Sequence, residues 1–409
     1  MSKDHFKPIM DALAKHSALY PQESPMKVKE RKGSLIIGIP KELELQENRT
    51  CLTPESVGIL VDNGHQVLLE AGAGAASKFT DQQYSEKGGQ IAYTRKEVFE
   101  ANIILKVEPP TLEEIELMKP KSSLISAVQM ASLKPEYITA LNKKKITSVG
   151  FEFIEDKGGL KPVVRSMSEI AANCIVTISG ELLGNSGNGM GVIFGGVTGV
   201  PPIKLIILGA GTIAENVARA ARHLGADVKI FDNHLYKLRR IKKEVGEELY
   251  TSMIDNYTLT KELETADVVV GALRSEEGSS LCVVTEEMVS KMRSDAVIID
   301  VSISQGGCFA TSRMTTHENP TYRMYDVIHY CVPNIASRAS RTATKSLSYI
   351  FTPMLLQIGR VRGVEEMMAE KDWFRTGVYT YNGHLTSNII GNKFSLPWKD
   401  LDLLFAARF

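Results

Sequence analysis

Cysteine, net charge and long apolar runs are all scarce in this chain of 409 residues. The five cysteines are odd in number and show no CxxC spacing, so we predict neither a disulfide framework nor a zinc or other metal site. Lysine plus arginine and aspartate plus glutamate are equal at 48 each, which removes the basic excess expected of a nucleic-acid-binding protein. No run of about 18 apolar residues occurs, so we expect no membrane insertion. These absences favour a cytoplasmic protein with a small-molecule ligand.

The first 33 residues form an N-terminal extension without the continuous apolar core of a secretory signal. Its apolar residues Phe6, Ile9, Met10 and Leu13 recur at helical spacing. This pattern predicts a short amphipathic helix packed on the protein body or on a partner subunit. A membrane anchor or transit peptide is the alternative, and Asp4 argues against it.

From residue 34 the chain alternates apolar strand-like and periodic helix-like segments, which indicates parallel βα units. A long helix and a glycine-rich connection over 165–202 separate two such series, and the tail after residue 337 is mostly helical in pattern. The predicted strands of the two series are 34–40, 65–72, 101–108 and 122–129, then 204–210, 227–232, 267–273 and 296–302, and the predicted helices of the first series are 53–64 and 133–145.

A glycine-rich turn stands between a predicted strand and a predicted helix in the second series. Gly209, Gly211 and Ala214 give the pattern GxGxxA, which permits a tight turn and close approach of a pyrophosphate to the positive end of the helix. Asp232 follows Gly211 by 21 positions (232 minus 211), near the spacing of a carboxylate that binds the adenosine ribose. An acid there repels a 2′-phosphate, so NAD is preferred over NADP. A tight turn without a ligand is the alternative.

These patterns predict an α/β fold of two doubly wound domains. A Rossmann NAD-binding domain (165–337) is inserted into a discontinuous Rossmann-like substrate domain (34–164 and 338–409).

Several motifs, in order, resemble the alanine dehydrogenases, which are grouped with the nucleotide-binding part of the transhydrogenase alpha chain. The resemblance runs from residue 38 to about 385 and implies two α/β domains with a cleft between them, usually in a homo-hexamer. It implies oxidation of an amino acid by NAD to a 2-oxo acid and ammonia. The motifs are GIPKE (38–42), ENRTCLTP (47–54), LKVEPP (105–110), MSEIA (167–171), GGVTGVPP (195–202), LGAGT (208–212), IDVSISQGGCF (299–309) and YCVPN (330–334).

Arg49 matches the family's carboxylate-binding arginine, and its planar fork suits a bidentate clamp. A surface salt bridge is the alternative for this residue. Lys106 aligns with the first of two family lysines, which makes it a candidate catalytic residue by resemblance.

Three positions depart from the family's catalytic pattern. Glu108 replaces the second lysine, Gln129 the catalytic histidine and Ser304 the active-site aspartate. Glutamine can orient a substrate but cannot move a proton at neutral pH, and Ser304 offers a hydrogen bond but no charge. Glu108 would be a base if burial raised its pKa, but beside Lys106 or Arg49 we expect it to stay ionised. A carboxylate there would also suit a second cationic group on a larger amino acid.

The cofactor positions implied by the resemblance are better preserved. A core role is the alternative for Val301 and Ile335, and a helix-surface role for Lys237. In addition to Gly209, Gly211 and Ala214, the positions are Ser168, Thr212, Asp232, Lys237, Val301, Asn334 and Ile335.

The sequence therefore predicts an NAD-dependent amino-acid dehydrogenase with an altered substrate pocket, acting on L-alanine or a related amino acid and assembled as a homo-oligomer. A non-catalytic NAD(H)-binding sensor or scaffold is the second hypothesis, because of the three replacements. A transhydrogenase-like NAD(H)-binding component is the third. Gln129 suits it, but its Arg-x-x-x-x-Asp signature is not recognisable near 167–171.

Overall fold

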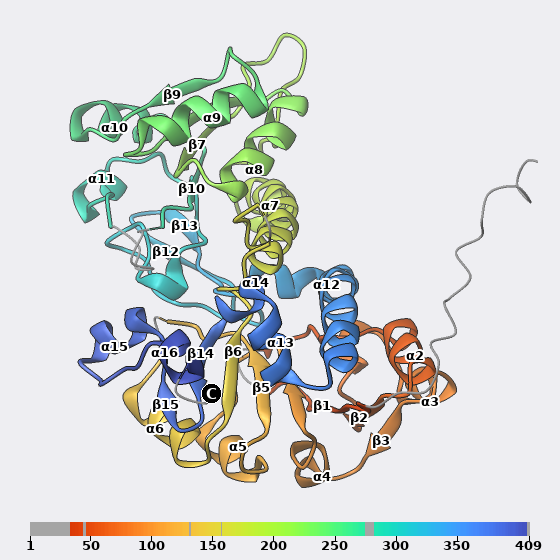
Figure 1. The fold of residues 1–409 in the computed structure, drawn as a ribbon. Helices are drawn as coiled ribbons and strands as arrows, with labels where there is room; N and C mark the ends of the chain where they lie inside the picture. Colours follow the sequence, from red (N-terminus) through yellow and green to blue (C-terminus); the bar gives the residue numbers. More distant parts are fainter. Residues whose placement is uncertain (1–32, 44–45, 131, 157, 275–281, 407–409) are drawn as a thin grey trace, which may run out of the picture.

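The computed structural model describes residues 33–43, 46–130, 132–156, 158–274 and 282–406 (Figure 1). It contains two sheets, one with strand order β15-β14-β6-β5-β4-β1-β2-β3 and one with order β12-β13-β11-β10-β7-β8-β9. Pairing is parallel except at the edges, where β14 runs antiparallel to β6 and β15, and β12 antiparallel to β13. Helices cover the sheets, so the predicted class of two doubly wound α/β domains is confirmed.

The eight-stranded sheet contains the first βα series and the end of the chain. Its central strands are continuous apolar runs because both of their faces are covered. Helix α2 begins after Thr53, whose side chain accepts a hydrogen bond from the backbone N–H of Ser56. The strands are β1 (Ile36–Ile39), β2 (Gln66–Glu70), β3 (Gln90–Ala92), β4 (Ile103–Leu105), β5 (Ser123–Ser126), β6 (Thr147–Gly150), β14 (Val378–Tyr381) and β15 (His384–Leu385), and the helices are α2 (Pro54–Asp62), α3 (Asp81–Glu86), α4 (Arg95–Phe99), α5 (Leu112–Leu117) and α6 (Pro135–Lys143).

Two predicted strands are shorter in the structure. Strand β4 ends at Leu105 and β5 at Ser126, whereas the apolar runs predicted strands to 108 and 129. Glu108 and Gln129 therefore lie just beyond the carboxyl ends of neighbouring parallel strands. This is the edge at which ligands bind in open α/β sheets.

The seven-stranded sheet contains the second βα series. Figure 1 shows it above the eight-stranded sheet, with its own covering helices. The strands are β7 (Lys204–Leu208), β8 (Asp227–Phe231), β9 (Tyr250–Ser252), β10 (Val268–Gly271), β11 (Val297–Asp300), β12 (Thr321–Met324) and β13 (Val327–Tyr330), and the helices are α8 (Thr212–His223), α9 (Leu235–Val245), α10 (Asn256–Leu263) and α11 (Glu286–Ser290).

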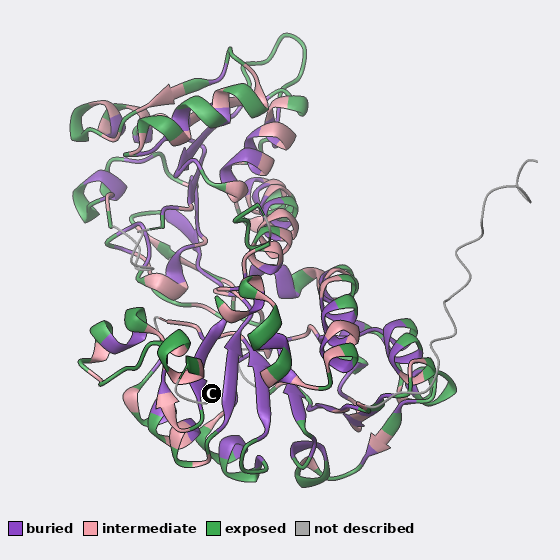
Figure 2. Cartoon of the chain, viewed as in Figure 1, coloured by how far each residue is buried: buried purple, intermediate pink, exposed green. Residues whose placement is uncertain are grey.

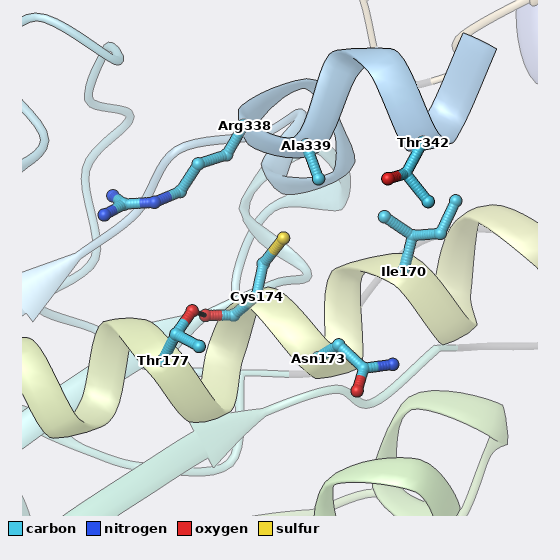
Figure 3. Close-up of a pocket in the computed structure, with 7 residues that line it drawn as sticks. All are labelled: Ile170, Asn173, Cys174, Thr177, Arg338, Ala339 and Thr342. Atoms are coloured by element: carbon cyan, nitrogen blue, oxygen red, sulfur yellow. Dashed lines mark hydrogen bonds between the residues drawn. The ribbon is translucent and has the colours of Figure 1, made fainter. Parts of the chain in front are cut away.

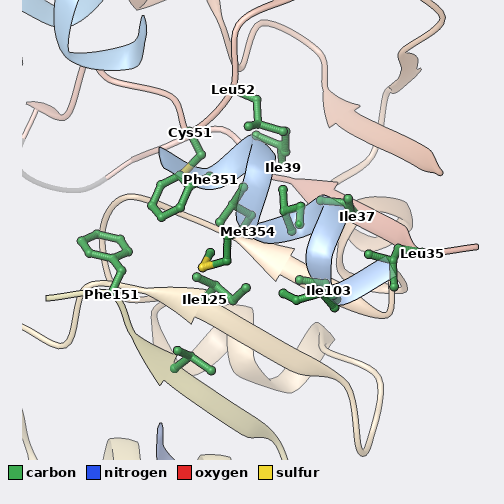
Figure 4. Packing of buried hydrophobic residues seen from close by; sticks show 14 of the residues in the cluster. Leu35, Ile37, Ile39, Cys51, Leu52, Ile103, Ile125, Phe151, Phe351 and Met354 are labelled. Atoms are coloured by element: carbon green, nitrogen blue, oxygen red, sulfur yellow. The ribbon is translucent and has the colours of Figure 1, made fainter. Parts of the chain in front are cut away.

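Two long helices, α7 (Pro162–Leu183) and α12 (Ser340–Val361), lie where the two sheets meet and pack against each other. Phe351 and Met354 of α12 pack over Ile37 and Ile39 of β1 in the main core of the eight-stranded sheet (Figure 4). Burial is concentrated in the strands and on the inner faces of the helices (Figure 2).

The tail after α12 is helical, as predicted, but it also supplies the antiparallel pair β14 and β15. The predicted amphipathic helix near the N-terminus lies outside the described residues. Within the described ranges, no helix combines the length and apolarity needed to cross a bilayer. The remaining helices are α13 (Val364–Glu370), α14 (Asp372–Arg375), α15 (Asn388–Phe394) and α16 (Leu401–Ala406).

Candidate functional site at the facing strand edges

The glycine turn follows β7 and opens α8. Gly209 has φ +108°, and a Cβ there would lie 2.5 Å from the carbonyl oxygen of Ala272, so only glycine fits. Gly211 is the exposed N-cap of α8, and no side chain caps the helix. A Cβ on Gly211 would meet nothing within 4 Å. The first N–H groups of α8 therefore border open space, which is the arrangement that binds an anion.

Asp232 lies directly after β8 and is 3% exposed. Its Oδ2 accepts a hydrogen bond of 2.8 Å from the N–H of Ala210, inside the glycine turn. Its Oδ1 accepts one of 2.7 Å from the N–H of His234 and lies 3.0 Å from the ring Nδ1. Lys237 approaches the same ring, with its Nζ 3.4 Å from Nδ1. The carboxylate thus fixes the turn to the loop that precedes α9.

The remaining predicted cofactor positions divide into core and edge. Ile335 is 2% exposed in the apolar cluster of the seven-stranded sheet, and Val301 packs against that cluster. Ala214 is buried, while Thr212 and Ser168 are half-buried on α8 and α7. Val301 packs against the core but also lies at the edge, directly after β11. Asn334 follows β13, and both residues are at the same end of the sheet as the glycine turn.

Ser304 lies half-buried in a short 3₁₀ turn, Ile303–Gln305, after β11. Asp300 holds this loop in place: its Oδ2 accepts hydrogen bonds from the N–H of Cys308 at 2.8 Å and from the hydroxyl of Ser312 at 2.6 Å. Asp300 is fully buried, so we assign it an anchoring role.

Arg49 lies in the segment after β1, at the edge of the eight-stranded sheet. Its Nε donates to Oε1 of Glu47 at 2.7 Å, and its Nη2 contacts Oε2 of Glu47 at 2.5 Å. The same Nη2 lies 3.6 Å from Oε1 of Glu108. The predicted carboxylate clamp is therefore already engaged by a carboxylate of its own chain. Within the described part of the chain, Nη1 of Arg49 has no hydrogen-bond partner.

Glu108 and Gln129 are in direct contact. Gln129 donates a hydrogen bond from Nε2 to Oε2 of Glu108, which is 3% exposed. The backbone of Gln129 is left-handed, with φ 49°, and Glu152 stabilises it by accepting hydrogen bonds from the N–H groups of Val128 at 2.7 Å and Gln129 at 3.1 Å. The side chain of Gln129 is thus aimed at Glu108 from the neighbouring strand.

The electrostatics correct the expectation that Glu108 stays ionised. Burial, followed by the negative charge of Glu47, raises the pKa of Glu108 well above its usual value. Burial also opposes ionisation of Glu47, but the charge and hydrogen bonds of Arg49 outweigh it and lower the pKa of Glu47 to about 2. Arg49 cannot keep both acids ionised because its guanidinium is committed to Glu47.

Lys106 is 1% exposed and is held by two acids. Its Nζ lies 3.0 Å from both carboxylate oxygens of Glu114 on α5 and 3.4 Å from Oε2 of Glu42. Burial raises the pKa of Glu42 to about 7, although Lys106 opposes the shift. The resemblance gave Lys106 a catalytic position, whereas these contacts place it inside a buried ion network.

Five residues at this site were not singled out from the sequence: Glu42, Glu47, Glu114, Glu152 and Arg274. Glu47 stands two positions before Arg49, and Glu152 closely follows the buried strand β6. Carboxylates at such strand ends were the available signal.

The edges of the two sheets lie opposite each other and are joined by hydrogen bonds. Asn334, after β13, donates from Nδ2 to Oε2 of Glu47 at 3.2 Å. The N–H of Asn48 donates to the hydroxyl of Ser337 at 2.8 Å. The charge of Arg274, after β10, counteracts part of the burial that raises the pKa of Glu152. The predicted cofactor edge and substrate edge therefore meet.

A hollow of about 430 Å³ lies elsewhere, between α7 and the start of α12 (Figure 3). Cys174 points toward this space from α7, and Arg338 and Thr342 lie opposite it. None of the predicted site residues lines the hollow, whose lining residues are Ile170, Asn173, Cys174, Thr177, Arg338, Ala339 and Thr342.

Comparison with known proteins gives matches along most of the chain. Residues 38–171 match the alanine dehydrogenase/PNT N-terminal domain, and residues 175–388 match the alanine dehydrogenase/PNT C-terminal domain. An alanine dehydrogenase of Methanococcus maripaludis is 36% identical over 89% of this chain and 98% of its own length, and one of Bacillus subtilis is 35% identical over 86% and 93%.

Solved structures agree. An L-alanine dehydrogenase superposes with a TM-score of 0.81 at 30% identity, covering 88% of this chain and 99% of its own. A transhydrogenase from Sinorhizobium meliloti shares the fold, with a TM-score of 0.72 at 21% identity over 86% and 99% of the two chains. With both domains matched in order, the chain belongs to the alanine dehydrogenase/PNT family.

Proposed function

We propose that this protein is an NAD-dependent dehydrogenase that oxidises L-alanine or a related amino acid to the 2-oxo acid and ammonia. The observation that carries the proposal is the uncapped N-terminus of α8 at Gly211, opening at the same edge as Asp232. The relatives named alanine dehydrogenase support the reaction class.

The residues present fit a dinucleotide. The open space at Gly211 admits a pyrophosphate to the N–H groups of α8, and Thr212 adds a hydroxyl in the first turn. Asp232, already held beside the turn, has acceptor capacity for ribose hydroxyls and would repel a 2′-phosphate. When bound, NAD supplies the hydride acceptor.

On the substrate edge, Arg49 would bind the substrate carboxylate through Nη1, because Nε and Nη2 are bonded to Glu47. Gln129 would orient the substrate or a water by hydrogen bonding. Ser304 would donate a hydrogen bond from the facing loop. A cationic group on a larger amino acid would find Glu108 beside it.

The test joins two measurements on one preparation. NADH and NADPH affinities are measured by fluorescence, and NADH oxidation is followed with pyruvate plus ammonium and then with a panel of other 2-oxo acids. We expect tighter binding of NADH than of NADPH, and turnover with at least one 2-oxo acid. Failure to bind either nucleotide would overturn the cofactor assignment.

A second candidate is a non-catalytic NAD(H)-binding protein. It is favoured by the absence of a histidine at the position of Gln129 and by the engagement of Arg49 with Glu47. Tight NADH binding with no turnover on any amino or oxo acid of the panel would establish this second function and exclude the first.

A further inference from the structure

We propose that Glu108 is the proton-transfer residue of this enzyme, acting as one half of a carboxylic acid–carboxylate pair with Glu47 that the guanidinium of Arg49 holds together. The inference rests on the proposed dehydrogenase function and adds the group that moves protons where the family's histidine is replaced.

Two buried carboxylates, Glu47 and Glu108, share the single cation of Arg49. The side chain of Glu47 is 0% exposed and that of Glu108 is 4% exposed, and both face Nη2 of Arg49, at 2.5 Å and 3.6 Å. Two buried carboxylates beside one cation cannot both ionise without a large electrostatic cost, so one of them keeps its proton. Glu47 has the two short contacts with the guanidinium, and the proton therefore resides on Glu108.

The other charged groups of the same domain do not provide Glu108 with a second cation. Lys106 would be the second cation, but both oxygens of Glu114 and one of Glu42 surround its ammonium. Glu42 adds a further negative charge that raises the pKa of Glu108. Gln129 is neutral and donates to Oε2 of Glu108, which assigns the proton to Oε1.

Among the described residues of the facing domain, no cation lies within ion-pair distance of Glu108 either. Asn334 is neutral and donates to Glu47. Behind it, His317 Nε2 lies 3.0 Å from Oδ1 of Asn334, and burial lowers the pKa of this histidine, so it is neutral at pH 7. The charge of Arg274 acts on Glu152, whose carboxylate accepts a hydrogen bond from the N–H of Gln129. Within the described ranges, no group of three or more His, Cys, Asp or Glu is arranged to hold a metal ion.

The chemistry follows from the oxidised substrate. The carbon carries an iminium cation, and this charge next to Glu108 favours release of its proton to a water molecule, from which Glu108 takes a proton back when the ammonium leaves. As water adds to the iminium carbon, the carboxylate takes a proton from the water oxygen, leaving a neutral carbinolamine. Glu108 returns this proton to the nitrogen, the C–N bond breaks, and the hydroxyl proton passes through Glu108 to the leaving ammonia, which departs as ammonium. Atoms and charge balance, since iminium plus water give the 2-oxo acid plus ammonium.

The experiment uses the full-length protein and reads the proton directly. Infrared difference spectra between wild type and Glu108→Gln at pH 7 report whether residue 108 has a carboxylic acid carbonyl band. We expect the band in wild type, its loss in Glu108→Gln, and its loss in Glu47→Gln as well, because Arg49 would then be free to ionise Glu108. Glu116→Gln, on the exposed face of α5, is the control that should leave the spectrum unchanged.

Kinetics complete the test. Removing a general acid–base group costs about 10²–10⁴-fold in kcat, so Glu108→Gln should lose at least about 100-fold while its NADH affinity stays within about twofold of wild type. Glu47→Gln should move the acidic limb of the kcat pH profile to lower pH. A purely structural Glu108 would leave that limb in place.

Two failures can be told apart. Wild-type protein without turnover on any substrate overturns the proposed function, and the catalytic role of Glu108 with it. Wild-type turnover that survives in Glu108→Gln, or a wild-type spectrum without the acid band at pH 7, overturns only this inference.

Discussion

The two strand edges that meet in this protein are constructed in different ways. On the cofactor edge, each acid is satisfied by nearby neutral donors: Asp232 by N–H groups on both sides, and Asp300 by N–H groups and a hydroxyl. On the substrate edge, Glu47, Arg49 and Glu108 depend on one another's charge. A replacement on the cofactor edge therefore has local consequences, whereas one on the substrate edge changes the protonation of its neighbours.

The largest effect on stability is expected when the buried Lys106 of the substrate edge is replaced. Lys106→Met would leave Glu42 without its cation and Glu114 with Arg95 alone, and breaking a buried pair in this way costs about 3–5 kcal/mol. The free energy of unfolding, from urea titrations, should fall by that amount. The matched control is Lys291→Met, which breaks an exposed helix pair with Glu287 and should leave the free energy of unfolding nearly unchanged. A similar cost for both variants would show that the substrate edge is not a charge-coupled network.

The pH dependence of stability also tests whether the acids of the substrate edge are coupled by charge. The pKa of Glu42 is about 7 in the folded protein against an ordinary value of 4.5. The folded state therefore retains a proton that the unfolded state loses, so this contribution is complete below pH 4.5 and disappears as the pH rises through 7. Over that window the contribution of Glu42 to the free energy of unfolding should fall by up to about 3 kcal/mol, at about 1.4 kcal/mol per pH unit.

Glu42→Gln should make this slope shallower by the contribution of Glu42, while the contribution of Glu108 remains, measured as urea unfolding at a series of pH values from 4.5 to 8. Glu116→Gln, which changes an exposed acid, should keep it. An unchanged slope in Glu42→Gln would refute the assignment to Glu42.

The cofactor edge is tested by adding a charge where the structure has none. In Gly211→Asp, a carboxylate at the N-cap of α8 would occupy the open space and repel a pyrophosphate. We expect NADH affinity to fall about 100-fold, or about 2.7 kcal/mol, while thermal stability is kept or raised because aspartate is a favourable N-cap. Gly159→Asp adds the same charge in open space at an exposed turn and should leave NADH binding unchanged. Undiminished NADH binding in Gly211→Asp would place the nucleotide elsewhere.

The smallest effect is expected from a neutral hydrogen bond on the cofactor edge. Ser302 donates from its hydroxyl to the carbonyl of Leu273 at 2.6 Å. Ser302→Ala should lower the free energy of unfolding by about 1 kcal/mol, several times less than Lys106→Met. A loss as large as that of the buried lysine would erase the difference between the two edges.

Those parts of the fold were predictable whose sequence patterns occupy successive residues. The motif of the glycine turn occupies six successive residues, and the central strands are unbroken apolar runs. The unpredicted strands have two to four residues each and lie toward the ends of the two sheets; they are β3, β6, β9, β12, β13, β14 and β15. β14 pairs with β6 from more than 200 positions away, and nothing in its own residues indicates that partner.

The site shows the same division. The structure brings Arg49, Glu108 and Gln129 together, as the motif positions indicated. The charge state of Glu108 was not predictable, because it depends on which acid Arg49 selects. Glu114, eight positions beyond Lys106, reaches that lysine only because α5 folds back on β4. Pairings of this kind depend on tertiary structure and leave no periodic pattern in the sequence.

The hydrogen bond from Asn334 to Glu47 joins the cofactor domain to the acid pair. A donor to a carboxylate stabilises its ionised form, so moving the domains apart would raise the proton affinity of Glu47. By thermodynamic linkage, protonation of the pair must in turn favour separation of the domains. This hydrogen bond thus links the protonation of Glu47 to the contact between the two sheet edges.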